Sequence, residues 1–385
     1  MFDRHAGSER VVLVSLDFGE PDYADGLEEL HRLADSASLE VVGLIEGRRA
    51  RPDPALFAGT GKVEEIAALV QASEAGLVIF NHNLSPAQER NLEAQLMCRV
   101  VDRTTLILDI FARRAKSAEG QLQVELAQLG HMATRLVRGW THLERQKGGV
   151  GLRGPGETQL ETDRRLLGKR VKLLKDRLIK QHQQRTIQRR ARLRGRVMSV
   201  SLVGYTNAGK STLFNALTHA GSYAADQLFA TLDTTTRQLY LPEAGEIVLS
   251  DTVGFITRLP HTLVESFRAT LEETINADLL LHIVDAASPN RDKQIAEVNK
   301  VLAEIGADHV PQILIMNKID LNHIEAGVER DEYDKITRIK LSAKTGAGIG
   351  LLREMLVEKV NTFKLPAAQS ASRTLINNEY HPELD

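Results

Sequence analysis

GYTNAGKS, residues 204–211, matches the pattern G-x-x-x-x-G-K-[ST] of a phosphate-binding loop. Apolar residues 197–203 predict a buried strand before it, and residues 211–217 predict a helix after it. Successive backbone N–H groups of such a loop surround phosphate oxygens, and the helix N-terminus adds its partial positive charge. Lys210 would reach the β- and γ-phosphates, and Ser211 would hold magnesium. The expected nucleotide contacts here are Gly204, Tyr205, Thr206, Asn207, Ala208, Gly209, Lys210, Ser211 and Thr212.

Two later motifs predict which base is bound. NKID, residues 317–320, follows a predicted strand at 312–316, and SAK, residues 342–344, follows another at 337–341. The Asp320 carboxylate can accept two hydrogen bonds from guanine N1–H and N2–H₂, whereas ATP would leave a buried carboxylate unpaired. The N–H of Ala343 is expected at guanine O6. The predicted guanine pocket consists of Asn317, Lys318, Asp320, Ser342, Ala343 and Lys344.

Two segments between these motifs are expected to respond to the γ-phosphate. DTVG, residues 251–254, follows a predicted strand at 246–250. Asp251 would hold magnesium through water, and the N–H of Gly254 would sense the γ-phosphate. Both segments should be mobile without GTP, ordered by its γ-phosphate and released on hydrolysis.

The other segment is FATLDTTTR, residues 229–237, which should supply a threonine that closes over magnesium and the γ-phosphate. We choose Thr231, with Phe229 as a further nucleotide contact, and keep Thr234, Thr235 and Thr236 as alternatives. Because threonine favours strands, an edge strand is the alternative interpretation for any single one of them. The expected catalytic set is Lys210, Thr231 and Gly254, and the expected metal ligands are Ser211, Thr231 and Asp251.

Phe255 follows DTVG, at the position where Ras-like GTPases carry the glutamine that orients the attacking water. Phenylalanine cannot do this, so unaided hydrolysis is expected to be slow. Asn207 offers one aid, since an Asn there in related GTPases helps to bind a potassium ion that replaces an arginine finger. The alternative is that Asn207 only tightens the loop. A large stimulating partner is the other aid.

The composition limits the number of domains, the redox compartment and the possibility of membrane spans. The 385 residues, 42% of them hydrophobic, are enough for two or three domains with cores of their own. The single cysteine, Cys98, excludes an internal disulfide and fits a reducing compartment. No signal core is visible, and no apolar run approaches the roughly 18 residues of a membrane span. We expect a soluble cytoplasmic monomer, with peripheral membrane association left open.

Charge is unevenly distributed along the chain. Residues 164–196 hold 14 Lys or Arg against one acid, Asp176, so this segment carries about +13 in a chain of net charge −2. The remainder must therefore carry about −15. A solvated helix face is the usual interpretation of a charge run, but a run with so few acids repels itself. RNA is therefore favoured as a partner.

The spacing of apolar residues predicts an α/β protein. The first strands, at 11–18, 39–45, 77–80 and 99–101, alternate with helices, which predicts a parallel sheet. The predicted parts are an N-terminal α/β domain at 1–118, a long antiparallel helical hairpin with a Gly-rich tip and a basic second helix at 119–196, a P-loop GTPase domain with a mostly parallel sheet and helices on both faces at 197–364, and a C-terminal tail at 365–385.

Two other glycine-rich segments carry functional alternatives. The hairpin tip, residues 147–157, is predicted to probe RNA, and a flexible turn is the alternative. GTGK, residues 59–62, is similar to half a phosphate-binding loop but lacks the spacing and the following Ser or Thr. An ordinary loop-to-helix turn is favoured there, and a second, weaker nucleotide site is left open.

The motifs GYTNAGKST, DTVGF, NKID and SAK resemble those of the HflX branch of the translation-factor-related GTPases. The resemblance extends outside the GTPase domain, over about residues 11–362, through LSPAQERNLE (84–93), LILDIFARRA (106–115), QVELAQL (123–129) and RGWTHLERQKGGVGLRGPGETQLETDRR (138–165). Thr234 departs from the family pattern, which usually has proline there, and this loosens the switch. The small further domain that members often carry after the GTPase domain is not expected here.

The resemblance implies a GTPase that binds the large ribosomal subunit, with its N-terminal domain and hairpin near the peptidyl-transferase region. It implies splitting or rescue of stalled ribosomes under stress. We expect GTP and GDP as ligands, Mg²⁺ as cofactor and potassium near Asn207. The alternatives are a large-subunit assembly GTPase, an RNA-remodelling ATPase with a second nucleotide site in the N-terminal half, and a non-catalytic RNA-binding scaffold with a nucleotide switch.

Overall fold

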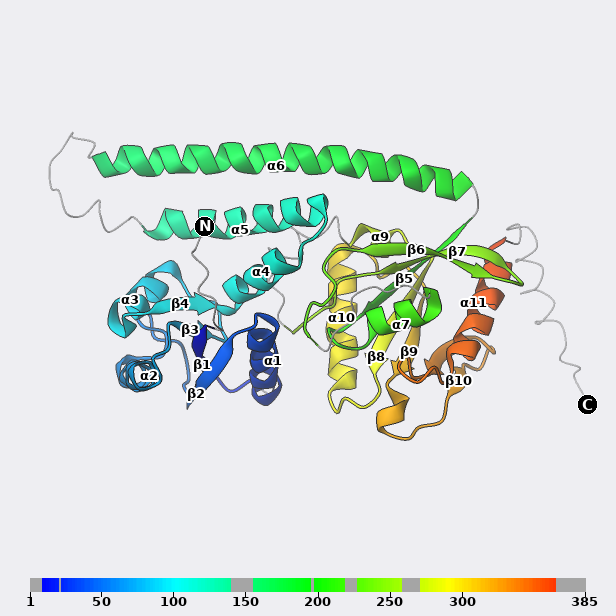
Figure 1. The fold of residues 1–385 in the computed structure, drawn as a ribbon, viewed down its shortest axis with the longest axis horizontal. Helices are drawn as coiled ribbons and strands as arrows, with labels where there is room; N and C mark the ends of the chain where they lie inside the picture. The colour runs from blue at the N-terminus through cyan, green and yellow to red at the C-terminus, as the bar shows by residue number, and fades with distance from the viewer. Residues whose placement is uncertain are drawn as a thin grey trace, which may run out of the picture. The chain divides into compact units, whose positions relative to one another are not determined.

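The described part of the chain contains two β-sheets, one of four strands and one of seven (Figure 1). The structure, a computed structural model, describes residues 9–20, 22–139, 155–194, 197–218, 227–257 and 271–364. The described residues fall into two compact units. Unit 1 takes those within Met1–His182, Ala225–Asp233 and Thr257–Arg268, and unit 2 takes those within Gln183–Ala224, Thr234–Ile256 and Ala269–Asp385. The predicted domain boundaries stay predictions.

Unit 1 is built on a four-stranded sheet in the order β2-β1-β3-β4, in which all neighbours are parallel, as predicted. Its strands are β1 (Arg10–Asp17), β2 (Glu40–Arg48), β3 (Leu77–Phe80) and β4 (Arg99–Asp102). Its first helices are α1 (Tyr23–Ser36), α2 (Thr60–Ser73), α3 (Pro86–Leu96) and α4 (Arg103–Arg114). Val12, Val14 and Leu16 of β1 pack with α2 and α3, while Val11 and Leu13 point to the face that α1 and α4 cover.

The start of α3 is stabilised by a capping box. Ser85 Oγ accepts a hydrogen bond from Gln88 N at 3.3 Å, and Gln88 Oε1 accepts one from Ser85 N at 2.9 Å. Pro86 occupies the first helical position, where its missing N–H costs nothing. These contacts join residues only three positions apart, so they fix where α3 begins.

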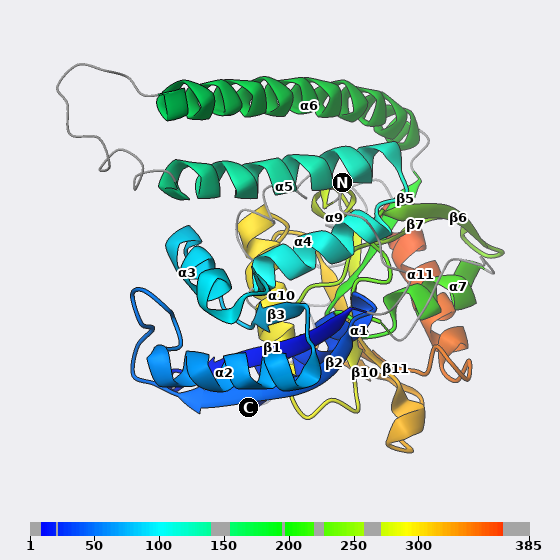
Figure 2. The ribbon, with the colours of Figure 1, turned by 60° about the vertical axis from the view of Figure 1, so that its left-hand side comes forward.

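The predicted antiparallel helix pair is also present, as α5 (Ala118–Gly139) and α6 (Pro155–Arg194), which lie side by side in Figures 1 and 2. Arg170 of α6 forms an ion pair with Glu125 of α5 at 2.6 Å. Leu174 of α6 is fully buried. The prediction of a Gly-rich tip up to residue 157 is wrong at its end, because α6 begins at Pro155 and proline is favoured at a helix start. Residues 147–154 lie outside the described residues.

Unit 2 contains a seven-stranded sheet in the order β10-β11-β9-β8-β5-β7-β6, parallel except at its two antiparallel edge strands. The strands are β5 (Met198–Gly204), β6 (Thr235–Leu241), β7 (Gly245–Asp251), β8 (Leu279–Asp285), β9 (Gln312–Asn317), β10 (Gly327–Arg330) and β11 (Ile336–Lys340). The helices are α7 (Lys210–Thr218), α9 (Glu272–Ile275), α10 (Arg291–Ile305), the 3₁₀ helix η2 (Ile319–Leu321) and α11 (Ile349–Lys364). Helices α7 and α11 share one core with the sheet, and α10 contacts β5 and β8.

The threonine-rich stretch divides at Thr235. Thr235 and Thr236 lie in the edge strand β6, which is the alternative interpretation considered for this segment. Thr231 precedes the strand, in the segment Ala225–Asp233 that belongs to unit 1. The predicted C-terminal tail, residues 365–385, lies outside the described residues.

Candidate nucleotide-binding site

The phosphate-binding loop connects the end of β5 to the start of α7. Gly204 has a φ of 147° and Gly209 a φ of 94°, which residues with a side chain avoid. A Cβ at Gly204 would collide with the carbonyl oxygen of Ile283, and one at Gly209 with the side-chain amide of Asn317. The loop therefore lies directly against β8 and β9, and this close approach requires glycine at both positions.

Lys210 places a buried cation inside the loop. The residue is 6% exposed, and its Nζ donates to the carbonyl oxygens of Gly204 at 3.1 Å and Tyr205 at 2.8 Å. Burial lowers the pKa of Lys210 from 10.5 to about 8, and the Asp251 carboxylate partly opposes this shift. An ammonium group with so little water around it is a strong partner for phosphate.

Ser211 and Asp251 supply two oxygen donors where α7 begins and β7 ends. Ser211 Oγ lies 2.6 Å from Asp251 Oδ2, and Asp251 is 1% exposed. Magnesium prefers hard oxygen ligands and is commonly held by one or two protein side chains together with substrate phosphates. The two residues therefore fit the magnesium ion that the sequence predicts.

The segment after β7 runs along the phosphate-binding loop. Phe255 N donates to Gly204 O at 3.2 Å, and Thr206 N donates to Phe255 O at 2.7 Å. A Cβ at Gly254 would lie 2.9 Å from Lys210 Nζ, so the Gly254 backbone lies beside the loop's cation. The Phe255 ring is buried in the interior. It therefore cannot orient a water molecule.

Asn317 joins the loops on the guanine side. Its Nδ2 donates to Ala208 O at 2.8 Å, and its Oδ1 accepts from Ala343 N at 2.9 Å. Asn317 is buried, so these bonds are shielded from water. The Ala343 N–H, predicted at guanine O6, here engages Asn317, and its contact with a base stays a prediction.

Asp320 is oriented by Ser342. Ser342 Oγ donates to Asp320 Oδ1 at 2.6 Å and accepts from Thr345 N at 3.2 Å. Ser342 is fully buried, so the hydroxyl holds the carboxylate in one orientation. A carboxylate oxygen can accept more than one hydrogen bond, which leaves Asp320 able to receive donors from a base.

Asp285 is a residue of this edge that the sequence analysis missed. It ends β8, and its Oδ2 lies 2.8 Å from Lys318 Nζ. Lys318 has a φ of 64°, which a lysine rarely adopts, and the ion pair fixes this turn. The signal that could have found Asp285 is its place at the end of an apolar run, as Asn317 ends β9.

His282 also escaped the sequence analysis. It lies opposite Val203 of β5 and is 1% exposed. Burial, opposed by a hydrogen bond with Gln312 and aided by the charge of Lys210, lowers the pKa of His282 from 6.5 to about 4. The imidazole is therefore neutral at physiological pH, and Lys210 supplies the positive charge in this part of the site.

The predicted nucleotide contacts fall into two groups. Those of the phosphate-binding loop, DTVG, NKID and SAK belong to unit 2 and lie near the carboxyl ends of its parallel strands. Thr212 and Lys344 among them are exposed. Phe229 and Thr231 belong to unit 1, and the Phe229 ring packs edge-on against Phe111. The roles of these two residues at the nucleotide stay predictions.

The described ranges contain neither a membrane-spanning helix nor a cluster of metal-binding side chains. None of their helices is long and apolar enough to cross a membrane. The same ranges contain no group of three or more His, Cys, Asp or Glu that could hold a metal ion. The candidate magnesium site accordingly rests on one carboxylate and one hydroxyl.

Family models match successive parts of the chain. The model described as GTP-binding GTPase N-terminal matches residues 24–112, GTP-binding GTPase Middle Region matches 114–192, and 50S ribosome-binding GTPase matches 199–318. The chain is 55% identical to GTPase HflX of Escherichia coli (strain K12), over 97% of this chain and 89% of that protein. It is 48% identical to GTPase HflX of Magnetococcus marinus, over 91% of this chain and 82% of that protein.

A solved structure agrees at the level of the fold. The crystal structure of SsGBP with GDP matches with a TM-score of 0.50 and 22% identity, over 92% of this chain and 100% of that one. That likeness supports the fold alone, whereas the HflX relatives are similar enough to establish the family. The chain hydrolyses GTP and belongs to the HflX family of P-loop GTPases.

Proposed function

We propose that this GTPase binds the large ribosomal subunit. Its affinity for the subunit changes with the GTP cycle, and this change serves to split or rescue stalled ribosomes under stress. The observation that carries the proposal is the charge on α6. Every Lys and Arg from Arg164 to Lys180 is exposed, and Arg170 alone among them forms an ion pair within the described residues. Such a row of cations is stabilised by the phosphate backbone of RNA. The family model for a 50S ribosome-binding GTPase adds support.

The proposed reaction is attack of water on the γ-phosphate of GTP. Lys210 binds the β- and γ-phosphates and stabilises the charge that develops on them, and the N–H of Gly254 donates to the γ-phosphate. Thr231 closes over the same group. Magnesium, held by Ser211, Asp251 and Thr231, would neutralise phosphate charge.

Guanine is proposed to bind between the NKID and SAK motifs. Asp320 accepts from the base, and the hydrogen bond from Ser342 keeps its carboxylate in position. Asn317 is proposed to position the loops rather than to bind the base. Its side-chain amide donates to the carbonyl of Ala208 and accepts from the N–H of Ala343. Selectivity for GTP over ATP then follows because adenine lacks the donor pair of guanine and would leave the half-buried Asp320 carboxylate without a partner on the base.

The attacking water needs a group that Phe255 cannot supply. We propose that a potassium ion at Asn207, or the ribosome itself, provides it. Turnover measured in potassium and in sodium separates the two, because equal rates exclude the ion. An Asn207→Ala variant that keeps ribosome-stimulated turnover would point to the ribosome.

The decisive experiment measures phosphate release with and without purified large subunits. We expect stimulation by the subunits and tighter subunit binding with a non-hydrolysable GTP analogue than with GDP. A chain that binds subunits identically with both nucleotides contradicts the proposal. Sucrose gradients of intact ribosomes then separate a splitting factor, which dissociates them, from an assembly factor, which binds only immature subunits.

A second candidate function rests on a hollow of about 740 Å³ in unit 1. It lies where β1 and β2 end and α2 begins, and its cationic lining consists of Arg48, Arg49, Arg51 and Lys62. This volume is typical of ligand sites, and the charge suits phosphates, which favours an ATP site in the N-terminal half. Competition calorimetry tests it. ATP that binds in the presence of saturating GTP, and loses affinity in Arg51→Ala, would support the site.

A further inference from the structure

Two segments beside the residues proposed to respond to the γ-phosphate have tertiary contacts in unit 1. One is residues 227–233, around Thr231, and the other is the chain at Thr257, three residues after Gly254. We propose that α4 holds both segments throughout the GTP cycle, so that unit 1 moves as one body with the nucleotide state, and that Asp233 is a positioning residue in this coupling. The inference rests on the proposed roles of Thr231 and Gly254. It adds how their movement reaches the helical hairpin.

The first contact is apolar and extensive. The Phe229 ring meets Phe111 of α4 with centroids 4.6 Å apart and an interplanar angle of 82°. Leu228 and Leu232 on either side are 3% and 2% exposed, and Leu228 N donates to Ser36 Oγ at 2.9 Å. Thr231 therefore lies in a segment whose neighbouring side chains are buried.

Asp233 attaches the same segment to the start of α5. Its Oδ2 accepts from Lys116 N at 2.8 Å and Ser117 N at 2.7 Å, and its Oδ1 accepts from Ser117 Oγ at 2.6 Å. A carboxylate is favourable at a helix N-terminus, where backbone N–H groups lack partners within the helix. A Cβ at Gly120 would collide with this carboxylate, so the contact also requires a glycine in the first turn of α5.

The second contact lies at the other end of α4. The carbonyl oxygen of Thr257, three residues after Gly254, accepts from Arg103 Nη2 at 3.1 Å, and Thr257 N donates to Glu29 Oε1 at 3.4 Å. Arg103 and Glu29 form an ion pair whose side chains are 6% and 8% exposed. Arg103 begins α4, and Arg114, which hydrogen-bonds Gln227, ends it. One helix thus holds both segments.

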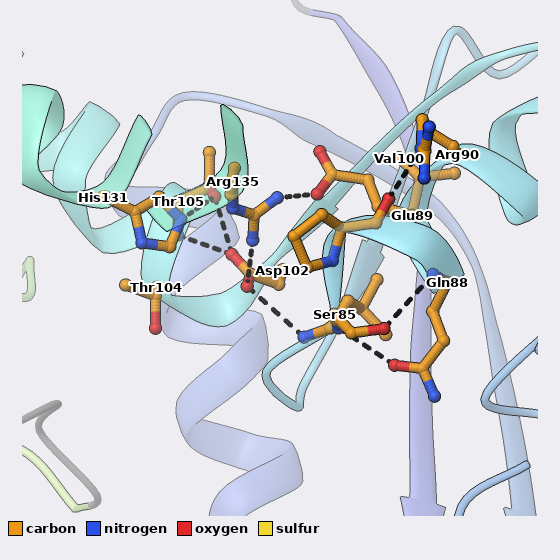
Figure 3. A network of polar contacts seen from close by, with 12 residues as sticks. Ser85, Gln88, Glu89, Arg90, Val100, Asp102, Thr104, Thr105, His131 and Arg135 are labelled. Carbon is orange, nitrogen blue, oxygen red and sulfur yellow. Dashed lines mark hydrogen bonds and ion pairs between the residues drawn. The ribbon is translucent and has the colours of Figure 1, made fainter. Parts of the chain in front are cut away.

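Helix α4 is in turn fixed to its neighbours (Figure 3). Asp102 caps α4 by accepting from Thr105 N at 2.8 Å, and it pairs with Arg135 of α5 at 2.6 Å. Arg135 also forms an ion pair with Glu89 of α3. Asp102 is 1% exposed, so this network is shielded from water. Displacement of α4 should therefore carry α3 and α5 with it.

Two free energies bear on whether residues 227–233 detach from unit 1 or stay attached and move with it: the burial of their apolar side chains and the coupling that a ligand can supply. Full burial of one large apolar side chain favours docking by roughly ten- to a hundredfold, and three such side chains are buried here. Coupling between two ligand sites typically shifts an equilibrium by only about 5- to 150-fold. The burial of these three side chains should therefore outweigh a coupling of typical size, so we expect the segment to stay docked on unit 1.

Amide hydrogen exchange on the full chain tests the first half of the proposal. The amides of Lys116 and Ser117 should be equally protected with GDP and with a non-hydrolysable GTP analogue. Asp233→Ala should speed their exchange by roughly tenfold or more in both states. Protection that is lost with one nucleotide only would mean that the segment detaches, and the proposal would be overturned.

Distances between spin labels test the second half. Labels at Met97→Cys in unit 1 and Tyr333→Cys in unit 2, in a Cys98→Ser background, use two strongly exposed positions. The distance should change between the two nucleotides, and the change should shrink in Asp233→Ala but persist in Asp53→Ala. Asp53 is a matched control, since its carboxylate also accepts two backbone N–H groups in unit 1.

An inter-label distance that is the same with both nucleotides would overturn the proposal. A nucleotide-dependent change of unreduced size in the double variant Asp233→Ala, Phe229→Ala would also overturn it, because the contact at Thr257 alone should transmit only part of the change. Calorimetry of GTP and GDP binding on the same samples separates these outcomes from a failure of the nucleotide site itself. Both nucleotides should bind the labelled chain.

Discussion

The guanine side of the site and the γ-phosphate side are built differently. On the proposed guanine side, Ser342 is hydrogen-bonded to Asp320, and Asn317 is hydrogen-bonded to the backbone of Ala208 and Ala343, all within unit 2. On the γ-phosphate side, Thr231 lies in a segment that belongs to the other unit. The base is the same throughout the cycle, so a rigid pocket suits it. The phosphate changes during the cycle, and a segment that can move suits Thr231, the residue proposed to sense it.

The largest effect is expected from Lys210→Ala, which should disrupt the phosphate side. Removing a buried cation that binds two phosphates should cost about 4 kcal/mol, or roughly 1000-fold in GTP affinity, because each charge-assisted hydrogen bond contributes about 1.5–3 kcal/mol. Calorimetry measures the loss. Lys300→Ala, an exposed lysine on α10, is the control and should bind GTP normally. Unchanged affinity in Lys210→Ala would refute the assignment of the loop.

Asp320→Asn should disrupt the guanine side alone. The amide turns a donor toward the donors of guanine, so GTP and GDP should both lose roughly 100-fold in affinity. Xanthosine nucleotides, whose base offers an acceptor in place of the amino group, should recover part of it. Asp308→Asn, at an exposed position of the same unit, should change nothing. A variant that still prefers guanosine to xanthosine nucleotides would contradict this assignment of Asp320.

Raising the pH above 8 should lower the affinity for GTP by up to about tenfold per pH unit, because the phosphate side loses a charge. The pKa of Lys210 is lowered to about 8, so the free protein keeps its charge below that pH and loses it above. Bound phosphates favour the charged form, so binding above pH 8 must take up a proton. Calorimetry at pH 9 in buffers of different ionisation enthalpy counts that proton. Zero uptake would show that Lys210 stays charged in the free protein.

The guanine side and the loop follow from local patterns in the sequence. Strands β5, β7 and β9 are apolar runs, and each is followed by its motif, so the carboxyl edge of a parallel sheet could be predicted as the site. The sheet of unit 1 was predictable for the same reason. The capping box of Ser85 and Gln88 likewise spans only a few residues.

The contacts in unit 1 could not be predicted in this way. The backbone donors to Asp233 lie 116 and 117 residues earlier in the chain, and no local pattern distinguishes Asp233 from an ordinary loop acid. Phe229 was assigned to the nucleotide from its place in a motif, although its ring packs on Phe111. In unit 2, the ion pair of Asp285 was missed for the same reason, because its partner, Lys318, follows a different strand. Contacts of this kind depend on the fold as a whole.

Ser342→Ala should give the smallest loss of nucleotide affinity. It also tests most directly whether the guanine side is independent of the γ-phosphate side. It removes the 2.6 Å hydrogen bond that orients Asp320, which should weaken binding by about 1 kcal/mol, or roughly fivefold. The loss should be equal for GTP and GDP, because the guanine side does not contact the γ-phosphate. Ser250→Ala is the control, since it deletes another buried hydroxyl, one that faces Thr236 at 3.2 Å. Unequal losses for GTP and GDP in Ser342→Ala would mean that the guanine pocket also senses the phosphate, and that the two sides are coupled within unit 2.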